Sequence, residues 1–186
     1  VSFNDTSIWV VTHWSDNVSK INPATSEVTA TVTVGSSPFG VAFDGTSIWV
    51  TNYLNRTVSK INPATNQVAA TLEVGSLPFG VAFDGTHIWV TNSMVGTVSK
   101  INPLTNDVTT PVTVGQAPEG VAFDGTHIWV VNRGSNSNNV SKINPATNEV
   151  TATVPVGQAP TGVAFDGTNI WVTNRGSNNV SKIIPF

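Results

Sequence analysis

The chain has 186 residues, of which 10% are charged, and a formal net charge of −3. It supplies no basic patch for phosphate contacts, which argues against a nucleic-acid partner. Without cysteine, stability must come from apolar burial and strand pairing. The chain has no stretch of about 18 apolar residues, so the sequence does not predict membrane insertion. A chain that begins at Val1 without a signal-like apolar run is expected to be a processed or excised soluble piece.

One block repeats along the whole chain. Gly40-Val41-Ala42-Phe43-Asp44-Gly45-Thr46 recurs from Gly80, Gly120 and Gly162, at periods of 40, 40 and 42 residues. Periods of this length are typical of propellers and solenoids. We therefore predict a single domain over residues 1–186, made of repeat units 1–39, 40–79, 80–119, 120–161 and a partial unit 162–186.

Each whole unit contains four short strand-like runs, which we name A to D in chain order. In the second unit they cover residues 40–43, 48–51, 58–61 and 68–74. Asp44-Gly45 predicts a tight A–B turn, and Pro63 ends strand C. Strands A and B are apolar on both faces, whereas strand D alternates valine or alanine with threonine, as in 28–34. We expect buried inner strands and a half-exposed outer strand.

This gradient predicts an all-β fold, a β-propeller of about five four-stranded blades stacked around an axis. The last blade lacks its outer strand, so the edge of its C strand is open to another strand. The alternative is a partial ring completed by another segment or chain. One tryptophan per unit is the expected filler between blades, and one aspartate per unit marks the A–B turn. These structural repeat residues are Trp9, Trp49, Trp89, Trp129, Trp171, Asp44, Asp84, Asp124 and Asp166.

Other repeated positions suggest surface roles. Each unit has a lysine in Val-Ser-Lys-Ile, as at Lys60, which we expect to point to solvent at the outer flank of a blade. His87 and His127 occupy an A–B turn position that is serine or asparagine in the other units, and are expected to be surface substitutions.

Trp49-Val50-Thr51-Asn52, following Pro38 to Asp44, resembles the YVTN-type propeller repeats of bacterial and archaeal surface proteins, with tryptophan in place of the usual tyrosine. The pattern is also similar to NHL propellers and to streptogramin B lyase. The resemblance covers essentially the whole chain and implies a propeller, commonly of seven blades in these families. For a lyase it implies a metal-assisted cluster of histidine and acidic residues. The histidines do not supply that cluster, because all except His13 belong to the opposite face.

In a propeller the A–B and C–D turns lie on one face, and the B–C and D–A loops lie on the other. The turns are nearly identical between units, whereas the loops vary; in the D–A loops, Phe39 and Phe79 are replaced by Glu119 and Thr161. Binding usually resides in such loops on a rigid scaffold. Our candidate ligand- or partner-binding residues are His13, Trp14, Asp16, Tyr53, Arg56, Met94, Glu119, Arg133 and Arg175.

In these loops, aromatic side chains could stack on a ligand, and arginine could bind carboxylate or phosphate through two donors. The sequence shows no Ser-His-Asp order with supporting geometry, no HExxH, no glycine-rich phosphate loop and no close pair of catalytic carboxylates. We therefore expect no catalytic residue, no metal ligand and no cofactor.

These observations favour a non-enzymatic binding or scaffolding propeller, secreted or at the cell surface, with a protein or glycan partner. Three alternatives stay open. The chain could be a structural subunit that forms a homo-oligomer through its open blade edge. It could be a carbohydrate-binding lectin, although the polar loop residues do not repeat between units. A streptogramin B lyase-like enzyme would depend on a metal and would lose activity in His13→Ala.

Overall fold

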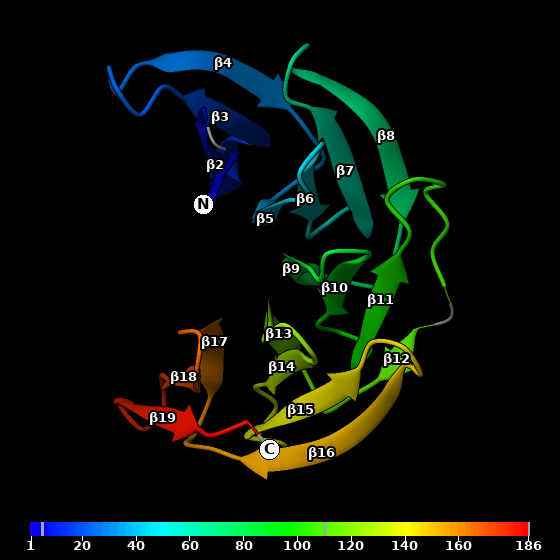
Figure 1. The fold of residues 1–186 in the computed structure, drawn as a ribbon, viewed down its shortest axis with the longest axis vertical. Coiled ribbons are helices and arrows are strands. Elements are labelled where there is room, and N and C mark those ends of the chain that lie inside the picture. Colours follow the sequence, from blue (N-terminus) through cyan, green and yellow to red (C-terminus); the bar gives the residue numbers. More distant parts are fainter. Residues whose placement is uncertain (5, 110, 186) are drawn as a thin grey trace.

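The computed structural model describes residues 1–4, 6–109 and 111–185, which form five antiparallel sheets (Figure 1). The first blade contains β1 (Ser2–Phe3), β2 (Ile8–Thr12), β3 (Asn17–Ile21) and β4 (Val28–Thr33), with the short 3-10 helix η1 (His13–Ser15) between β2 and β3. The second contains β5 (Pro38–Phe43), β6 (Ile48–Asn52), β7 (Thr57–Asn62) and β8 (Gln67–Glu73).

The remaining blades repeat this order. The third contains β9 (Pro78–Phe83), β10 (Ile88–Asn92), β11 (Thr97–Ile101) and β12 (Val112–Thr113). The fourth contains β13 (Pro118–Phe123), β14 (Ile128–Asn132), β15 (Asn139–Asn144) and β16 (Glu149–Pro155). The fifth has three strands, β17 (Pro160–Phe165), β18 (Ile170–Asn174) and β19 (Asn179–Ile183). Four four-stranded sheets and a three-stranded one confirm the predicted fold class.

The blades stand side by side in an arc around a central axis. Figure 1 shows the A strands β5, β9, β13 and β17 toward the centre and the D strands β4, β8 and β16 at the rim. The A strand of each blade contacts the A strand of the next one along this arc. The arc does not close, because a wide opening separates the first blade from the fifth (Figure 1). Within the described ranges, no helix is long and apolar enough to cross a membrane.

The turn sequences act as predicted. In the second blade, the Asp44 carboxylate Oδ1 accepts the backbone N–H groups of Thr46 and Ser47 at 2.7 and 2.6 Å. Gly45 has φ of 91°, a conformation that glycine adopts without a steric penalty. At the C–D turn, the Asn62 side chain accepts the Ala64 N–H at 2.9 Å. The second unit therefore encodes both of its hairpin turns within its own sequence.

The core lies between the blades. Trp49 and Val58 of the second blade, for example, pack against Ile88, Val90 and Ile101 of the third, and all five side chains are fully buried. The other three interfaces repeat this arrangement. Each blade is thus stabilised mainly by apolar burial against its neighbours, as in other stacked repeats.

Burial across a blade differs from the prediction in one respect. Strands β6, β10 and β14 are buried along their whole length, and the outer strands β8 and β16 are largely exposed, as expected. The A strands, however, are mostly half-buried. They are the first strand of each sheet and border the open centre of the arc, so one edge has no strand beside it.

The expectation that the repeated lysines point to solvent was wrong. Lys20, Lys60 and Lys100 donate through Nζ to a proline carbonyl in the C–D turn of the next blade at 2.6–2.7 Å. Each also lies over the tryptophan ring of its own blade, with Nζ 5.2–5.4 Å from the centroid. Lysine faces tryptophan across the B–C strand pair, so its long side chain runs along the indole and reaches the neighbouring blade.

Candidate functional site

The repeated tryptophan and aspartate form one contact in four blades. The indole Nε1 donates to the aspartate Oδ2 at 2.6–2.7 Å, in the pairs Trp49–Asp44, Trp89–Asp84, Trp129–Asp124 and Trp171–Asp166. The hydrogen bonds from Trp171 and from the backbone of Asn169 and Thr168 hold the pKa of Asp166 well below its ordinary value. This contact joins the A–B turn to strand B.

The threonine of the Trp-Val-Thr-Asn motif in strand B joins neighbouring blades near the axis. Thr91 Oγ1 accepts the Gly80 N–H at 2.8 Å and donates to the Glu119 carbonyl of the next blade at 2.7 Å. A Cβ at Gly80 would lie 2.4 Å from that carbonyl oxygen, so this close approach requires glycine. The motif's polar side chains are therefore engaged in the framework.

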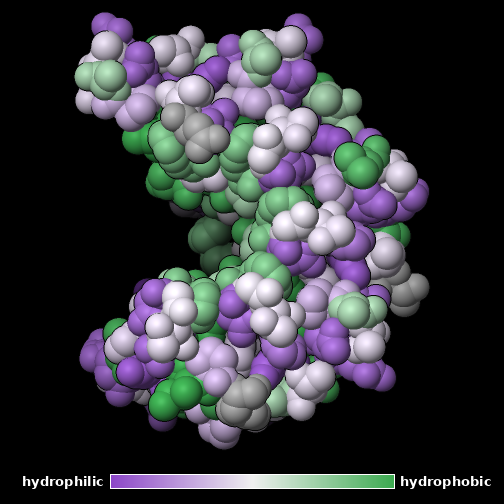
Figure 2. Space-filling model, in the orientation of Figure 1, coloured by the Kyte–Doolittle hydropathy of each residue, from purple (hydrophilic) through white to green (hydrophobic). Residues whose placement is uncertain are grey.

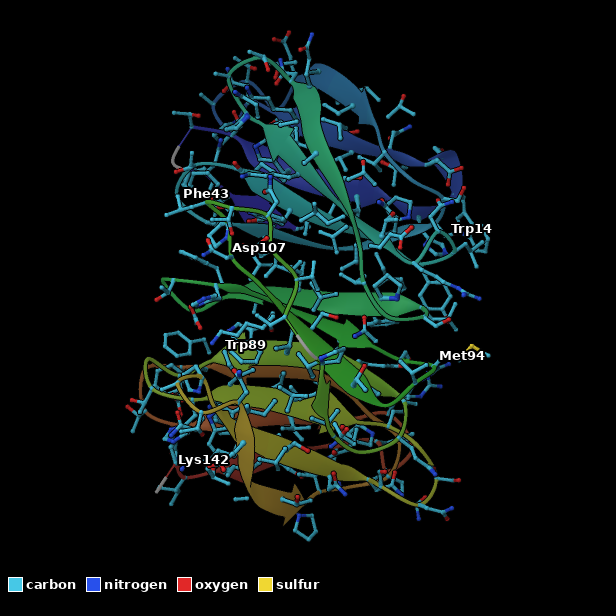
Figure 3. All side chains as sticks on the ribbon, turned by 90° about the vertical axis from the view of Figure 1, so that its right-hand side faces the viewer. Trp14, Phe43, Trp89, Met94, Asp107 and Lys142 are labelled. Carbon is cyan, nitrogen blue, oxygen red and sulfur yellow. The ribbon has the colours of Figure 1, made fainter. Side chains whose placement is uncertain are left out.

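The two ends of the hairpins lie on opposite faces of the molecule. Figure 3 shows Trp14 and Met94, from two B–C loops, on one side, and Phe43 and Lys142 on the other. We call the side that carries the B–C and D–A loops the loop face. Eight of the nine candidate binding residues lie in B–C loops, whereas Glu119, expected in a D–A loop, is the second residue of strand β13 on the same face.

On the loop face, the first residue of a B–C loop lies beside the second residue of the A strand of the same blade. In the second blade the Tyr53 and Phe39 ring centroids are 6.5 Å apart. In the fourth blade the Arg133 Nη1 lies 2.7 Å from the Glu119 Oε1, a salt bridge in which the Glu119 side chain is 7% exposed. The same scaffold position therefore carries an aromatic pair in one blade and an ion pair in another.

Five aromatic side chains from the first three blades meet on this face. We call them the aromatic cluster: His13, Trp14, Phe39, Tyr53 and Phe79. His13 packs edge-on against Trp14 and Phe39, with centroid distances of 4.6 and 5.6 Å, and Phe39 lies 3.7 Å from Phe79. Trp14 is nevertheless 90% exposed and Phe39 42% exposed. The cluster is thus ordered by its own contacts and still open to solvent.

Exposed aliphatic side chains extend this surface. Leu54 and Met94 follow in the neighbouring B–C loops and are 60% and 70% exposed. Met94 contacts Ser76 of the adjacent D–A loop through its sulfur at 3.5 Å. Figure 2 views the molecule from the opposite face, where hydrophobic surface also lines the central opening of the arc. A group of exposed apolar side chains on one face is typical of interaction sites.

The other candidates have different surroundings. Asp16 has φ of 50°, and its carboxylate accepts the Ser37 N–H of the next D–A loop at 2.8 Å, so it helps to hold the loop. Arg56 occupies the equivalent position in the second blade, is exposed, and has φ of 59°. Arg175 is exposed in the last blade, and no carboxylate lies within ion-pair distance of it in the described part of the chain.

The structure therefore brings His13, Trp14 and Tyr53 together, and Glu119 and Arg133 separately. It adds Phe39 and Phe79, which the candidate set lacked. Their signal was present in the sequence, because they occupy the D–A position of Glu119, which was chosen for its charge. Among the residues that the structure describes, no three histidine, cysteine, aspartate or glutamate side chains are placed to hold a metal ion.

Comparisons with known proteins address the fold. No family model and no curated protein matches the chain. Among solved structures, it is similar to Kuenenia stuttgartiensis hydrazine synthase, with a TM-score of 0.81, 20% identity, and coverage of 92% of this chain and 54% of that one.

Two further structures show the same fold. A catalytically inactive virginiamycin B lyase from Staphylococcus aureus, solved with quinupristin, has a TM-score of 0.81 and 16% identity, covering 97% of this chain and 63% of that one. A functionally unknown protein from Desulfotomaculum acetoxidans has a TM-score of 0.79 and 17% identity, covering 100% of this chain and 68% of that one.

The fold and these likenesses define a β-propeller fold, with five blades among the described residues. The chain spans 54% and 63% of the length of the first two structures, which is less than two thirds of each. The comparisons support the propeller fold, which these structures share, and give no support to the YVTN assignment. Because the matched proteins include enzymes and a protein of unknown function, the likeness fixes no activity.

Proposed function

We propose that this chain is a non-enzymatic binding module that takes a protein partner on its loop face. The observation that carries the proposal is the aromatic cluster, which is packed within itself yet exposed on the variable side of a repetitive scaffold. A secreted or cell-surface location and a scaffolding role are part of the proposal and rest on the resemblance to surface-protein propellers.

Aromatic side chains suit this role energetically. Fully burying one large apolar side chain contributes about 1.5–3 kcal/mol, and tryptophan and tyrosine are enriched among the residues that dominate protein interfaces. The contacts of His13 with Trp14 and Phe39 place the rings before a partner arrives, so less rotamer entropy is lost on binding. Trp14 and Phe39 would then act as anchors.

The charges of the loop face indicate the character of the partner. The aromatic cluster belongs to the first three blades, whereas the Glu119–Arg133 salt bridge and Arg175 belong to the last two. Arg175 faces no carboxylate among the described residues and offers its donors to one. We therefore propose a peptide segment that combines apolar side chains with an acidic group. A glycan is less well supported, because the polar loop residues do not repeat from blade to blade.

A displayed library of random peptides, selected on the wild-type chain, tests this proposal. Enriched peptides should combine apolar side chains with an acidic residue. Calorimetry should show that they bind Phe39→Thr at least about tenfold more weakly than the wild type, which corresponds to the loss of one anchor worth about 1.4 kcal/mol. Threonine occurs naturally at the same position, as Thr161, so the substitution uses a residue that the repeat already accommodates.

The matched control is Leu104→Ala. Leu104 is 91% exposed and lies in a C–D turn, which belongs to the opposite face. Its removal should leave the peptide affinity unchanged within about twofold, a difference well below one lost anchor. Peptides that bind Phe39→Thr as tightly as the wild type, or a library that yields no binder, would contradict the proposal.

A further inference from the structure

The two end blades each expose a face that is buried in every internal interface. On the last blade, Trp171 is 39% exposed and Val180 is 56% exposed, whereas the equivalent Trp129 and Val140 are fully buried. On the first blade, Phe3 is 54% exposed. Ile8, Val10 and Ile21 are half-buried there, although the equivalent residues of the second blade, Ile48, Val50 and Ile61, are fully buried.

These two faces are the two halves of one repeated interface. Between the fourth and fifth blades, Trp129, Val131 and Val140 pack against Ile170, Val172 and Ile183. The free face of the last blade presents Trp171 and Val180, the tryptophan side of this interface. The free face of the first blade presents Ile8, Val10 and Ile21, the aliphatic side. Both faces border the opening of the arc (Figure 1).

The last blade also has an unpaired strand edge. In the fourth blade, β15 pairs with β16 from Asn139 to Asn144. In the fifth blade, β19 pairs with β18 alone among the described strands, so its outer edge can take another strand. Lys182 already lies over Trp171, with Nζ 5.6 Å from the ring centroid, in the pose of the lysines that reach the next blade.

We propose that the opening between the first and last blades is a docking site for a protein segment that folds as a further blade of this same repeat. Its leading strand pairs with β19, and its aliphatic side covers Trp171 and Val180. The proposal is independent of the loop face, because none of these residues belongs to the aromatic cluster.

Geometry favours such a segment over a whole second copy. The internal interfaces follow one another around a single axis (Figure 1). A second copy docked on the last blade in the same manner would continue around that axis, and its later blades would collide with the first blade. The solved structures with this fold are also longer, since the chain covers 54%, 63% and 68% of them.

The test extends the full chain by one blade. A copy of residues 144–186 replaces residues 184–186 after Ile183, which continues the repeat in register and supplies the missing C–D turn and D strand. Both parent and extended chains carry Trp14→Ser, so that Trp171 is the one tryptophan of the parent that acrylamide should quench readily. The appended copy carries phenylalanine at its own tryptophan position, which leaves Trp171 as the reporter.

The extended chain should lose the quenchable fraction of tryptophan fluorescence. A control extension of the same length carries serine at the three positions that copy Ile170, Val172 and Ile183, and should leave Trp171 quenchable. The proposal is overturned if Trp171 stays as quenchable in the extended chain as in the parent, with thermal unfolding showing the parent blades intact. It is also overturned if the unextended chain is a dimer by native mass spectrometry and Trp171→Ser abolishes that dimer, because a second copy then covers the face.

Discussion

At the scale of single residues, Trp9 differs from the other repeated tryptophans because Asn4 stands where they have an aspartate. In the other four blades the carboxylate accepts the indole N–H at 2.6–2.7 Å. Among the described residues, the buried Nε1 of Trp9 has no acceptor. A buried donor without a partner costs about 1–3 kcal/mol relative to a satisfied one.

Asn4→Asp should therefore stabilise the protein. The new carboxylate can accept the Trp9 indole N–H, and we expect the free energy of unfolding to rise by about 1 kcal/mol in urea titrations. The reverse change in the second blade, Asp44→Asn, should lower it by a similar amount or more. A destabilised Asn4→Asp would show that the first A–B turn does not place the carboxylate as the other turns do.

The aspartate contacts also predict an acid-sensitive fold. Burial raises the pKa of Asp124, but hydrogen bonds from Trp129 and from the backbone of His127 and Thr126 outweigh it, so the net pKa is lowered; that of Asp166 is lowered as well. A carboxyl group with a lowered folded pKa contributes stability above its unfolded pKa, about 3.9, and loses it as pH falls through the folded value. The free energy of unfolding should therefore drop below about pH 4, and less steeply in Asp124→Asn.

Thr91 offers a direct test of the bridge between blades. Thr91→Val removes the acceptor of the Gly80 N–H and the donor to the Glu119 carbonyl, and should cost about 1–2 kcal/mol of unfolding free energy. Valine fits this position sterically, because Val131 is its fully buried equivalent in the fourth blade. The opposite exchange, Val131→Thr, should be neutral or stabilising, and a strongly destabilised Val131→Thr would argue against the bridge.

At the scale of single elements, the B–C loops share a backbone feature despite their different sequences. The residue before each C strand has positive φ at Asp16, Arg56, Gly96, Asn138 and Asn178. In the first four loops its carbonyl accepts the N–H of a valine after strand D at 2.9–3.1 Å. The loop is therefore fixed at its base, and its tip is free to vary.

Arg56 is the least suited of these residues to a left-handed conformation. A non-glycine residue there costs about 1–2 kcal/mol, which asparagine and aspartate reduce through local hydrogen bonds. Arg56→Gly should raise the free energy of unfolding by about 1 kcal/mol, and Gly96→Arg should lower it. Chemical denaturation of the two variants measures both effects, and an unchanged Gly96→Arg would show that the loop base relaxes.

Strands and turns were predictable because their signals are local. Asp44-Gly45, Pro63 and the alternation in 28–34 each specify a hairpin or a strand face within a few residues. The contacts of the repeated lysines and the half-burial of the A strands were not predictable, because both depend on how one blade packs against the next. Lys100 finds its proline carbonyl 45 residues further along the chain, which no local pattern reveals.

At the scale of the whole molecule, the open arc leaves the end blades with one neighbour each. The third blade packs on both sides, through Trp89 toward the fourth blade and Ile88 toward the second. In stacked repeats, stability is roughly a sum of intrinsic terms and neighbour interfaces. The end blades should therefore open more often than the middle ones.

Hydrogen exchange can check this gradient. Backbone amides of β2 and β18 should exchange faster than those of β10, although all three are B strands with nearly the same sequence. The near-identity of the strands makes them internal controls for intrinsic exchange rates. Equal protection across the five blades would indicate that the end faces are covered in solution.

The sequence predicted which side of the fold carries the variable loops, but it did not predict which of their side chains contact one another. Comparing units showed that variation is concentrated in the B–C and D–A loops, which made their side the candidate binding side. Which loop residues meet depends on pairs within a blade and across to the next one, as in the contacts of Phe39 with Tyr53 and Phe79. Charge and aromatic character alone therefore selected Arg56 and Asp16, which lie outside the aromatic cluster.

The central claim is that function resides on the loop face. Its most direct test is NMR mapping of the wild-type chain with a peptide selected from the random library. We predict that amide signals shift around residues 37–40, 53–54 and 77–80, and that those around the Asp44-Gly45 and Asp84-Gly85 turns do not. Shifts confined to the A–B and C–D turns would contradict the account, because they would place the binding site on the invariant face.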